Sequence, residues 1–241
     1  MRAQRVLIHP GLHRTGTTFI QRVVLPAMLK PDSFVGPDHP FTDFLMGRIA
    51  EEPYVNFVDN MVISREGLTG SIEKRSDLYL SRLPKHLFPT FVITIRQPME
   101  LLKSIYLHNY SKYGNKRFLD VCKYSLIERI NLKQIEFDVR SRFPNSEIFY
   151  LSLDQLDHDP FHYHKFFSNY LNVNLDWMKP EPSPVNKRGN TKELLERISS
   201  RLGGQCEYTE REFDDDIASV ASIPEFLEVE EAYKARLLGV C

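Results

Sequence analysis

Residues Gly11 to Thr18, GLHRTGTT, have the spacing of a phosphate-binding loop, G-x-x-x-x-G-K-[ST], with one exception. Thr17 stands where that pattern has lysine, and the cation is instead Arg14, inside the loop. Gly16 lets the backbone approach a ligand closely. The hydroxyl groups of the loop belong to Thr15, Thr17 and Thr18. This composition predicts an anion site for a ligand that carries less charge than ATP with Mg²⁺.

A second group of phosphate-binding residue types lies in TIRQPMELLKSIYLH, residues 94–108. Arg96 ends an apolar run, Pro98 suits the first turn of a helix, and Ser104 follows the arginine by eight residues. An arginine fork forms planar, charge-assisted hydrogen bonds with phosphate, and a serine on a helix adds a hydroxyl donor. The segment therefore predicts a second phosphate contact where a strand leads into a helix.

Short apolar runs must supply the strands that position these groups. They cover residues 5–9, 60–64, 91–96 and 147–153, and helical segments separate them. Buried runs that alternate with amphipathic segments indicate a parallel sheet covered on both faces. We therefore predict an α/β fold with three layers, a central parallel sheet and a phosphate loop after its first strand.

The helix after the first strand has a clear apolar face from Thr17 onward, formed by Ile20, Val23, Val24, Ala27 and Met28. Pro26 is expected to kink this helix or end it near Leu25. The loop thus joins a strand to the N-terminus of a helix, where backbone N–H groups and the positive end of the helix dipole favour an anion.

Composition limits the possible classes of protein. The 241 residues include 42% hydrophobic and 26% charged residues, which suits a single domain over residues 1–241. A net charge of -1 argues against a protein that coats nucleic acid. The widely spaced Cys122, Cys206 and Cys241 suggest neither a disulfide framework nor a zinc site. The first apolar run is too short for a signal peptide or a transmembrane segment, so we expect a soluble, cytoplasmic protein.

Both phosphate motifs resemble those of the sulfotransferases, enzymes that use 3′-phosphoadenosine 5′-phosphosulfate (PAPS) as donor. GLHRTGTT is similar to their 5′-phosphosulfate loop, and the Arg96–Pro98–Ser104 pattern resembles their 3′-phosphate motif. The family more often has lysine in the loop, but Arg14 preserves the charge, as in the tyrosylprotein sulfotransferases. The resemblance implies PAPS as donor, 3′-phosphoadenosine 5′-phosphate (PAP) as product, and no metal.

Two weaker resemblances extend this assignment. NMVISREGL, residues 60–68, is similar to the S-x-E segment of bacterial and glycan-type sulfotransferases, which implies that Glu66 is the catalytic base. His13, inside the loop, is the second candidate, whereas His9 and His108 are expected to be packed or solvent-facing. The cluster NKRGN, residues 186–190, resembles the loop that closes over the 3′-phosphate. Its contributing residues would be Lys187, Arg188 and Gly189.

The resemblance implies transfer of a sulfuryl group to a hydroxyl or amine of a small molecule or glycan, and the sequence does not name this acceptor. A P-loop kinase or NTPase is an alternative, with Asp154 as a weak candidate metal ligand. A noncatalytic nucleotide-binding module is another, in which Glu66 is only a capping carboxylate. The charged segments 210–216 and 224–238 are predicted to be helical, without an assigned role.

Overall fold

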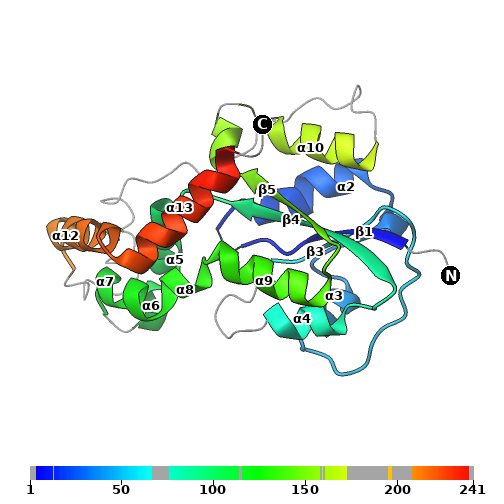
Figure 1. Cartoon of the computed structure of the whole chain (residues 1–241), viewed down its shortest axis with the longest axis horizontal. Coiled ribbons are helices and arrows are strands. Elements are labelled where there is room, and N and C mark those ends of the chain that lie inside the picture. The colour runs from blue at the N-terminus through cyan, green and yellow to red at the C-terminus, as the bar shows by residue number, and fades with distance from the viewer. Residues whose placement is uncertain are drawn as a thin grey trace. The chain divides into compact units, whose positions relative to one another are not determined.

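The computed structural model describes residues 4–12, 14–66, 76–113, 116–157, 159, 161–172, 195–196 and 208–238. The chain divides into two compact units. The first contains Met1–Arg96, Leu132–Ser183 and Arg236–Cys241, and the second contains Gln97–Asn131 and Pro184–Ala235. Figure 1 shows the elements of both units.

A five-stranded, fully parallel sheet forms the centre of the first unit, in the order β2-β3-β1-β4-β5. Its strands are β1 (Gln4–His9), β2 (Phe34–Val35), β3 (Met61–Ser64), β4 (Leu87–Ile95) and β5 (Glu147–Ser152). In the central register, Ile8 of β1 pairs with Ile63 of β3 and with Phe91 of β4. The predicted α/β class and the four predicted strands are confirmed, whereas β2, with only two residues, was not predicted.

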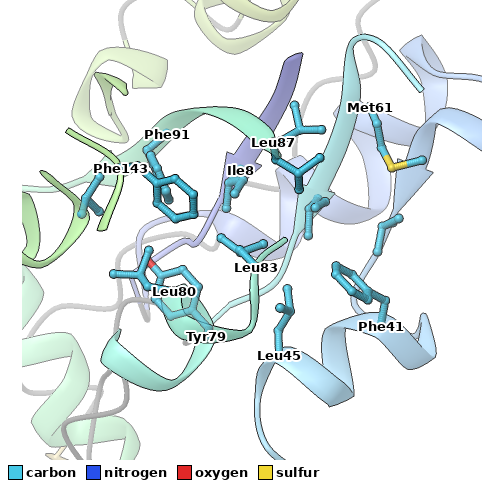
Figure 2. Close-up of a cluster of buried hydrophobic side chains, with 14 of the residues drawn as sticks. Ile8, Phe41, Leu45, Met61, Tyr79, Leu80, Leu83, Leu87, Phe91 and Phe143 are labelled. Atoms are coloured by element: carbon cyan, nitrogen blue, oxygen red, sulfur yellow. The ribbon is translucent and has the colours of Figure 1, made fainter. Parts of the chain in front are cut away.

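Helices cover both faces of this sheet (Figure 1). One face carries α3 (Pro40–Leu45), α4 (Ser76–Arg82) and α9 (Leu132–Arg142). Here Ile8 and Phe91 of the sheet belong to one buried cluster with Phe41, Leu45 and Tyr79 of the helices (Figure 2). The other face carries the helix after β1 and α10 (His162–Leu171), which bury the side chains of Leu7, Val24, Val62, Val92, Tyr163 and Phe167. Successive strand residues point to opposite faces, so β1 contributes alternately to the two clusters.

The helix after β1 is continuous through α1 (Thr17–Phe19), the π-helical segment η1 (Ile20–Val24) and α2 (Leu25–Met28). Of the two effects expected of Pro26, an end of the helix near Leu25 is wrong, whereas a kink stays a prediction. In the π-helical turn Leu25 N bonds to Ile20 O, and the helix continues past the proline. The wider turn also shifts the buried face, so Val23 is 43% exposed. Gln21, a polar residue of the π-helical segment, is buried.

The described part of the second unit is helical. It contains α5 (Pro98–His108), α6 (Tyr110–Tyr113), α7 (Phe118–Val121), the π-helical η3 (Cys122–Leu126), α8 (Ile127–Arg129), α12 (Glu210–Ala221) and α13 (Pro224–Leu238), whose last turn belongs to the first unit. The predicted helices at 98, 210–216 and 224–238 are confirmed. Tyr106, Phe118 and Phe213 form its aromatic core. Buried Asp216 accepts from Arg117 at 2.5 Å and from Leu119 N at 3.1 Å, which joins α12 to α7.

No helix within the described ranges is both long enough and apolar enough to cross a membrane.

The first unit also has two 3-10 turns, η2 (Pro31–Ser33) and η4 (Asp154–Asp157). The second of these follows β5 directly, so it lies at the same edge of the sheet as the loop after β1.

Candidate anion-binding site

The loop after β1 makes two sharp turns before its helix begins. Arg14 has φ 67° and Gly16 has φ 78°, both in the left-handed region. The backbone angle favours glycine at Gly16, where an added Cβ would also lie 2.7 Å from Leu153 Cδ1, the end of a side chain. Arg14 has no such freedom, and its exposed side chain is held on a strained backbone. Backbone strain of this kind is concentrated at functional sites.

The first glycine of the motif is required for a different reason. A Cβ added to Gly11 would lie 2.3 Å from Thr17 Cγ2 and 2.4 Å from Thr17 Oγ1. Thr17 is buried and is the first residue of α1, so packing and the helix both restrict its position. The start of the loop therefore packs directly against the start of the helix. The spacing of the two glycines in the sequence motif thus has a steric basis in this structure.

Two of the predicted loop hydroxyls face inward. Thr15 Oγ1 donates to Leu12 O at 2.7 Å, and Thr17 Oγ1 donates to the same carbonyl at 3.2 Å. Both side chains are buried, whereas Thr18 is exposed. The inner hydroxyls also meet Thr94 of β4, whose Oγ1 lies 2.7 Å from Thr15 Oγ1. Sequence reasoning missed Thr94, although a polar residue within the apolar run FVITIR was an available signal.

The helix N-terminus is suited to an anion. Gly16 O accepts from Phe19 N at 3.0 Å and from Ile20 N at 3.3 Å. The amides of Thr17 and Thr18 precede these, at the end of the helix where its geometry supplies no carbonyl partner. Exposed Arg14 adds a full positive charge in the same loop. Together these groups can bind a phosphate or sulfate through N–H donors, charge and the helix dipole.

The sheet topology places the loop after β1 at a switch point between β1 and β4. The chain leaves β1 toward β2 on one side of the sheet and leaves β4 toward β5 on the other. Ligands of open α/β sheets bind outside the carboxyl ends of strands at such a switch point. Arg96 immediately follows β4 and lies two residues after Thr94, which contacts the loop. The structure thus brings Arg14 and Arg96 to the same edge of the sheet.

Ser104 lies on α5 of the second unit. The sequence predicted that a helix carries this serine, and that helix is confirmed. Its pairing with Arg96 at a single phosphate stays a prediction. His13, Lys187, Arg188 and Gly189 lie outside the described residues, so their roles also stay predictions. Within the described ranges no group of three or more His, Cys, Asp and Glu side chains is arranged to hold a metal ion.

Glu66 follows the end of β3 and lies on a turn that buried polar groups hold in place. The side-chain amide of Gln21, oriented to suit its neighbours, accepts three hydrogen bonds. The donors are Glu66 N at 2.9 Å, Ser64 Oγ at 3.1 Å and Arg65 N at 3.2 Å. Gln21 lies on the helix that begins at the loop, so one side chain links that helix to the turn that carries Glu66.

His9 is packed beneath this turn, as expected for a histidine that is not the base. It is fully buried, and its Nδ1 lies 2.7 Å from Ser64 Oγ. Burial lowers the pKa of His9 to about 3, and the nearby negative charge of Glu66 offsets only part of that effect. His9 is therefore neutral at physiological pH, and Glu66, which is only half-buried, is the better-placed of the two groups for contact with a ligand.

Comparison with known proteins leaves the family open. No protein-family model matches this chain, and no curated protein matches it. Among solved structures, a crystal structure of a sulfotransferase from Alicyclobacillus acidocaldarius is similar at 13% sequence identity, with a TM-score of 0.46 and coverage of 96% of each chain. An identity and a TM-score this low do not bear on the chemistry of the site. The geometry itself establishes a braced loop with a cation at a helix N-terminus.

Proposed function

We propose that this chain is a sulfotransferase that moves a sulfuryl group from PAPS to a hydroxyl or amine of an acceptor such as a glycan or a small metabolite. One observation carries the proposal: a braced, lysine-free phosphate loop holds Arg14 at the sheet edge where Arg96 leaves β4. The resemblance of both segments to the sulfotransferase motifs supports PAPS as the donor.

Arg14 and the first amides of the helix would bind the 5′-phosphate and stabilise the charge that develops on it during transfer. The exposed hydroxyl of Thr18 would add a further donor. A sulfuryl group carries less negative charge than a phosphoryl group. One arginine with fixed N–H donors can therefore take the place of the lysine and Mg²⁺ that a triphosphate requires.

Glu66 is proposed as the base that accepts the proton of the acceptor. As the acceptor oxygen or nitrogen forms its bond to sulfur, the bond from sulfur to the 5′-phosphate oxygen breaks, and its electron pair stays on that oxygen. Arg14 neutralises this charge while the Glu66 carboxylate takes the proton. Gln21 supports the assignment, because its hydrogen bonds fix the backbone from which Glu66 projects.

Arg96 would bind the 3′-phosphate, assisted by Ser104. Lys187, Arg188 and Gly189 are proposed to close over the same group. Preference for a nucleotide with a 3′-phosphate distinguishes this assignment from the kinase alternative. PAP should raise the melting temperature without Mg²⁺, and by more than AMP or ADP does. Equal shifts with ATP and Mg²⁺ contradict the proposal.

Matched arginine variants test the two phosphate contacts. Arg96→Ala should weaken PAP binding, whereas Arg22→Ala, which removes an exposed arginine from the helix after β1, should leave it unchanged. Arg14→Ala should lower the rate of transfer about a hundredfold to a thousandfold, the usual effect of losing one charge-stabilising donor. Normal turnover by Arg14→Ala excludes the loop from the mechanism.

The identity of the base is tested by single-turnover transfer from labelled PAPS, with an acceptor identified by screening. Glu66→Gln keeps the size of the side chain but accepts no proton, so turnover should fall about a hundredfold while PAP affinity survives. His13→Ala is the contrasting variant. If Glu66→Gln retains normal turnover and His13→Ala loses it, the histidine is the base.

A further inference from the structure

A buried cluster of three threonine hydroxyls fastens the anion loop to the sheet. Thr15 and Thr94 are fully buried, and Thr17 is 2% exposed. Thr94 Oγ1 lies 2.7 Å from Thr15 Oγ1 and 3.5 Å from Thr17 Oγ1. Thr94 belongs to β4, the strand beside β1, so the cluster joins segments that are far apart in the sequence.

The direction of the hydrogen bonds follows from counting protons. Each hydroxyl has one proton to donate, and a carbonyl oxygen has two lone pairs. Leu12 O accepts from both Thr15 and Thr17, which uses the protons of both side chains. The 2.7 Å contact between Thr94 and Thr15 must therefore be donated by Thr94. A directed chain results, from Thr94 through Thr15 to the carbonyl of Leu12.

These hydrogen bonds act next to Arg14, the non-glycine residue of the loop with a left-handed backbone. Thr15 lies between Arg14 at φ 67° and Gly16 at φ 78°. A residue other than glycine keeps a left-handed backbone only when its surroundings determine that conformation. The anchored Thr15 side chain fixes the position next to Arg14, and Thr94 is the sheet's contribution to that anchor.

We infer that Thr94 is a positioning residue for the 5′-phosphate contact of the donor. It would act through Thr15, and without contact to the ligand, by holding the loop in the conformation that presents Arg14 and the helix amides. This inference rests on the proposed function, because it takes the loop to be the site of the 5′-phosphate.

The test measures affinity by titration calorimetry for two probes, PAP and adenosine 3′-monophosphate, which lacks the 5′-phosphate. Thr94→Val removes the hydroxyl and keeps the shape. We expect its Kd for PAP to rise about tenfold, the effect of one lost buried hydrogen bond. The Kd for adenosine 3′-monophosphate should stay unchanged, because that ligand makes no 5′-phosphate contact.

Two controls separate positioning from a general structural effect. Thr94→Ser keeps the donor and should bind PAP within about threefold of the wild type. Thr90→Val makes the same substitution at a buried threonine four residues earlier on β4 and should also bind normally. If Thr94→Val does not fold, Thr94→Ala removes the hydroxyl without a branched methyl group and serves for the same comparison.

The outcomes distinguish this inference from the proposed function. If the hydroxyl-free variant binds PAP as the wild type does, or loses affinity for both probes equally, the positioning role of Thr94 is overturned and the proposed function stands. If the wild-type chain itself binds neither probe, the proposed function is overturned, and the inference with it.

Discussion

Protonation of His9 should destabilise the fold as the pH falls from about 6.5 toward about 3. His9 ends β1 and is fully buried, with its Nδ1 beside Ser64 Oγ and its ring edge-on to Phe167 at 6.4 Å between centroids. Among the described residues its Nε2 has no hydrogen-bond partner. Burial in this packing disfavours a charged imidazole by more than the charge of Glu66 favours it, so the pKa of His9 is lowered.

The sign and size follow from linkage. Below the ordinary histidine pKa of about 6.5, His9 binds a proton in the unfolded chain but not in the folded chain. The free energy of unfolding therefore decreases with falling pH. With a folded pKa of about 3, the loss from His9 is about 1.4 kcal/mol at pH 5.5 and about 2.7 kcal/mol at pH 4.5. Above about pH 7 the contribution is constant.

Urea denaturation of the wild type and of His9→Asn, from about pH 7.5 to about pH 4.5, measures this contribution. Asparagine can still donate a hydrogen bond toward Ser64 but does not titrate. Other histidines with lowered pKa values, His39, His162 and His164, are present in both proteins and cancel in the difference. We expect the stability gap between the two proteins to narrow by about 2.7 kcal/mol over this range. A gap that does not change with pH refutes the reasoning.

Three further substitutions test the packing. Asp216→Asn should lower the free energy of unfolding by about 2–3 kcal/mol, measured in urea, because it removes a buried carboxylate that binds Arg117; an unchanged midpoint contradicts this. Gly11→Ala should lower the free energy of unfolding by about 1–3 kcal/mol, since the added Cβ overlaps Thr17. If the variant melts at the wild-type temperature, the loop relaxes to accommodate the Cβ. Arg236→Lys loses a bidentate contact with the Glu136 carboxylate of α9. It should lower the free energy of unfolding by about 1 kcal/mol or less in the same assay, because the pair is partly exposed. A larger loss contradicts this expectation.

Most of the sheet could be predicted from the sequence because β3 and nearly all of β4 are buried on both faces, as is β1 from Val6 to His9. Such strands appear as short, continuous apolar runs, and four of the five were found in this way. The strand β2 has only Phe34 and Val35 in its ladder, too short a run to stand out. The apolar face of the loop helix was placed only in part, because helical periodicity assumes a constant pitch and the π-helical turn at 20–24 changes it.

The residues of the candidate site also differ in whether a sequence motif can identify them. Arg14, Gly16 and Arg96 could be named because a loop and a strand end have fixed spacing along the chain. The bracing roles of Thr94 and Gln21 could not, because their partners lie far away in sequence and meet them only through the parallel pairing of β1 with its neighbours. Thr94 stands out in the sequence as a polar residue within an apolar run, but its partner does not. A residue that binds a ligand from a local motif is visible in one segment, whereas a residue that braces the motif is visible only once the register of the sheet is known. Variants of the bracing residues are therefore the ones whose effects the sequence alone would have left unexplained.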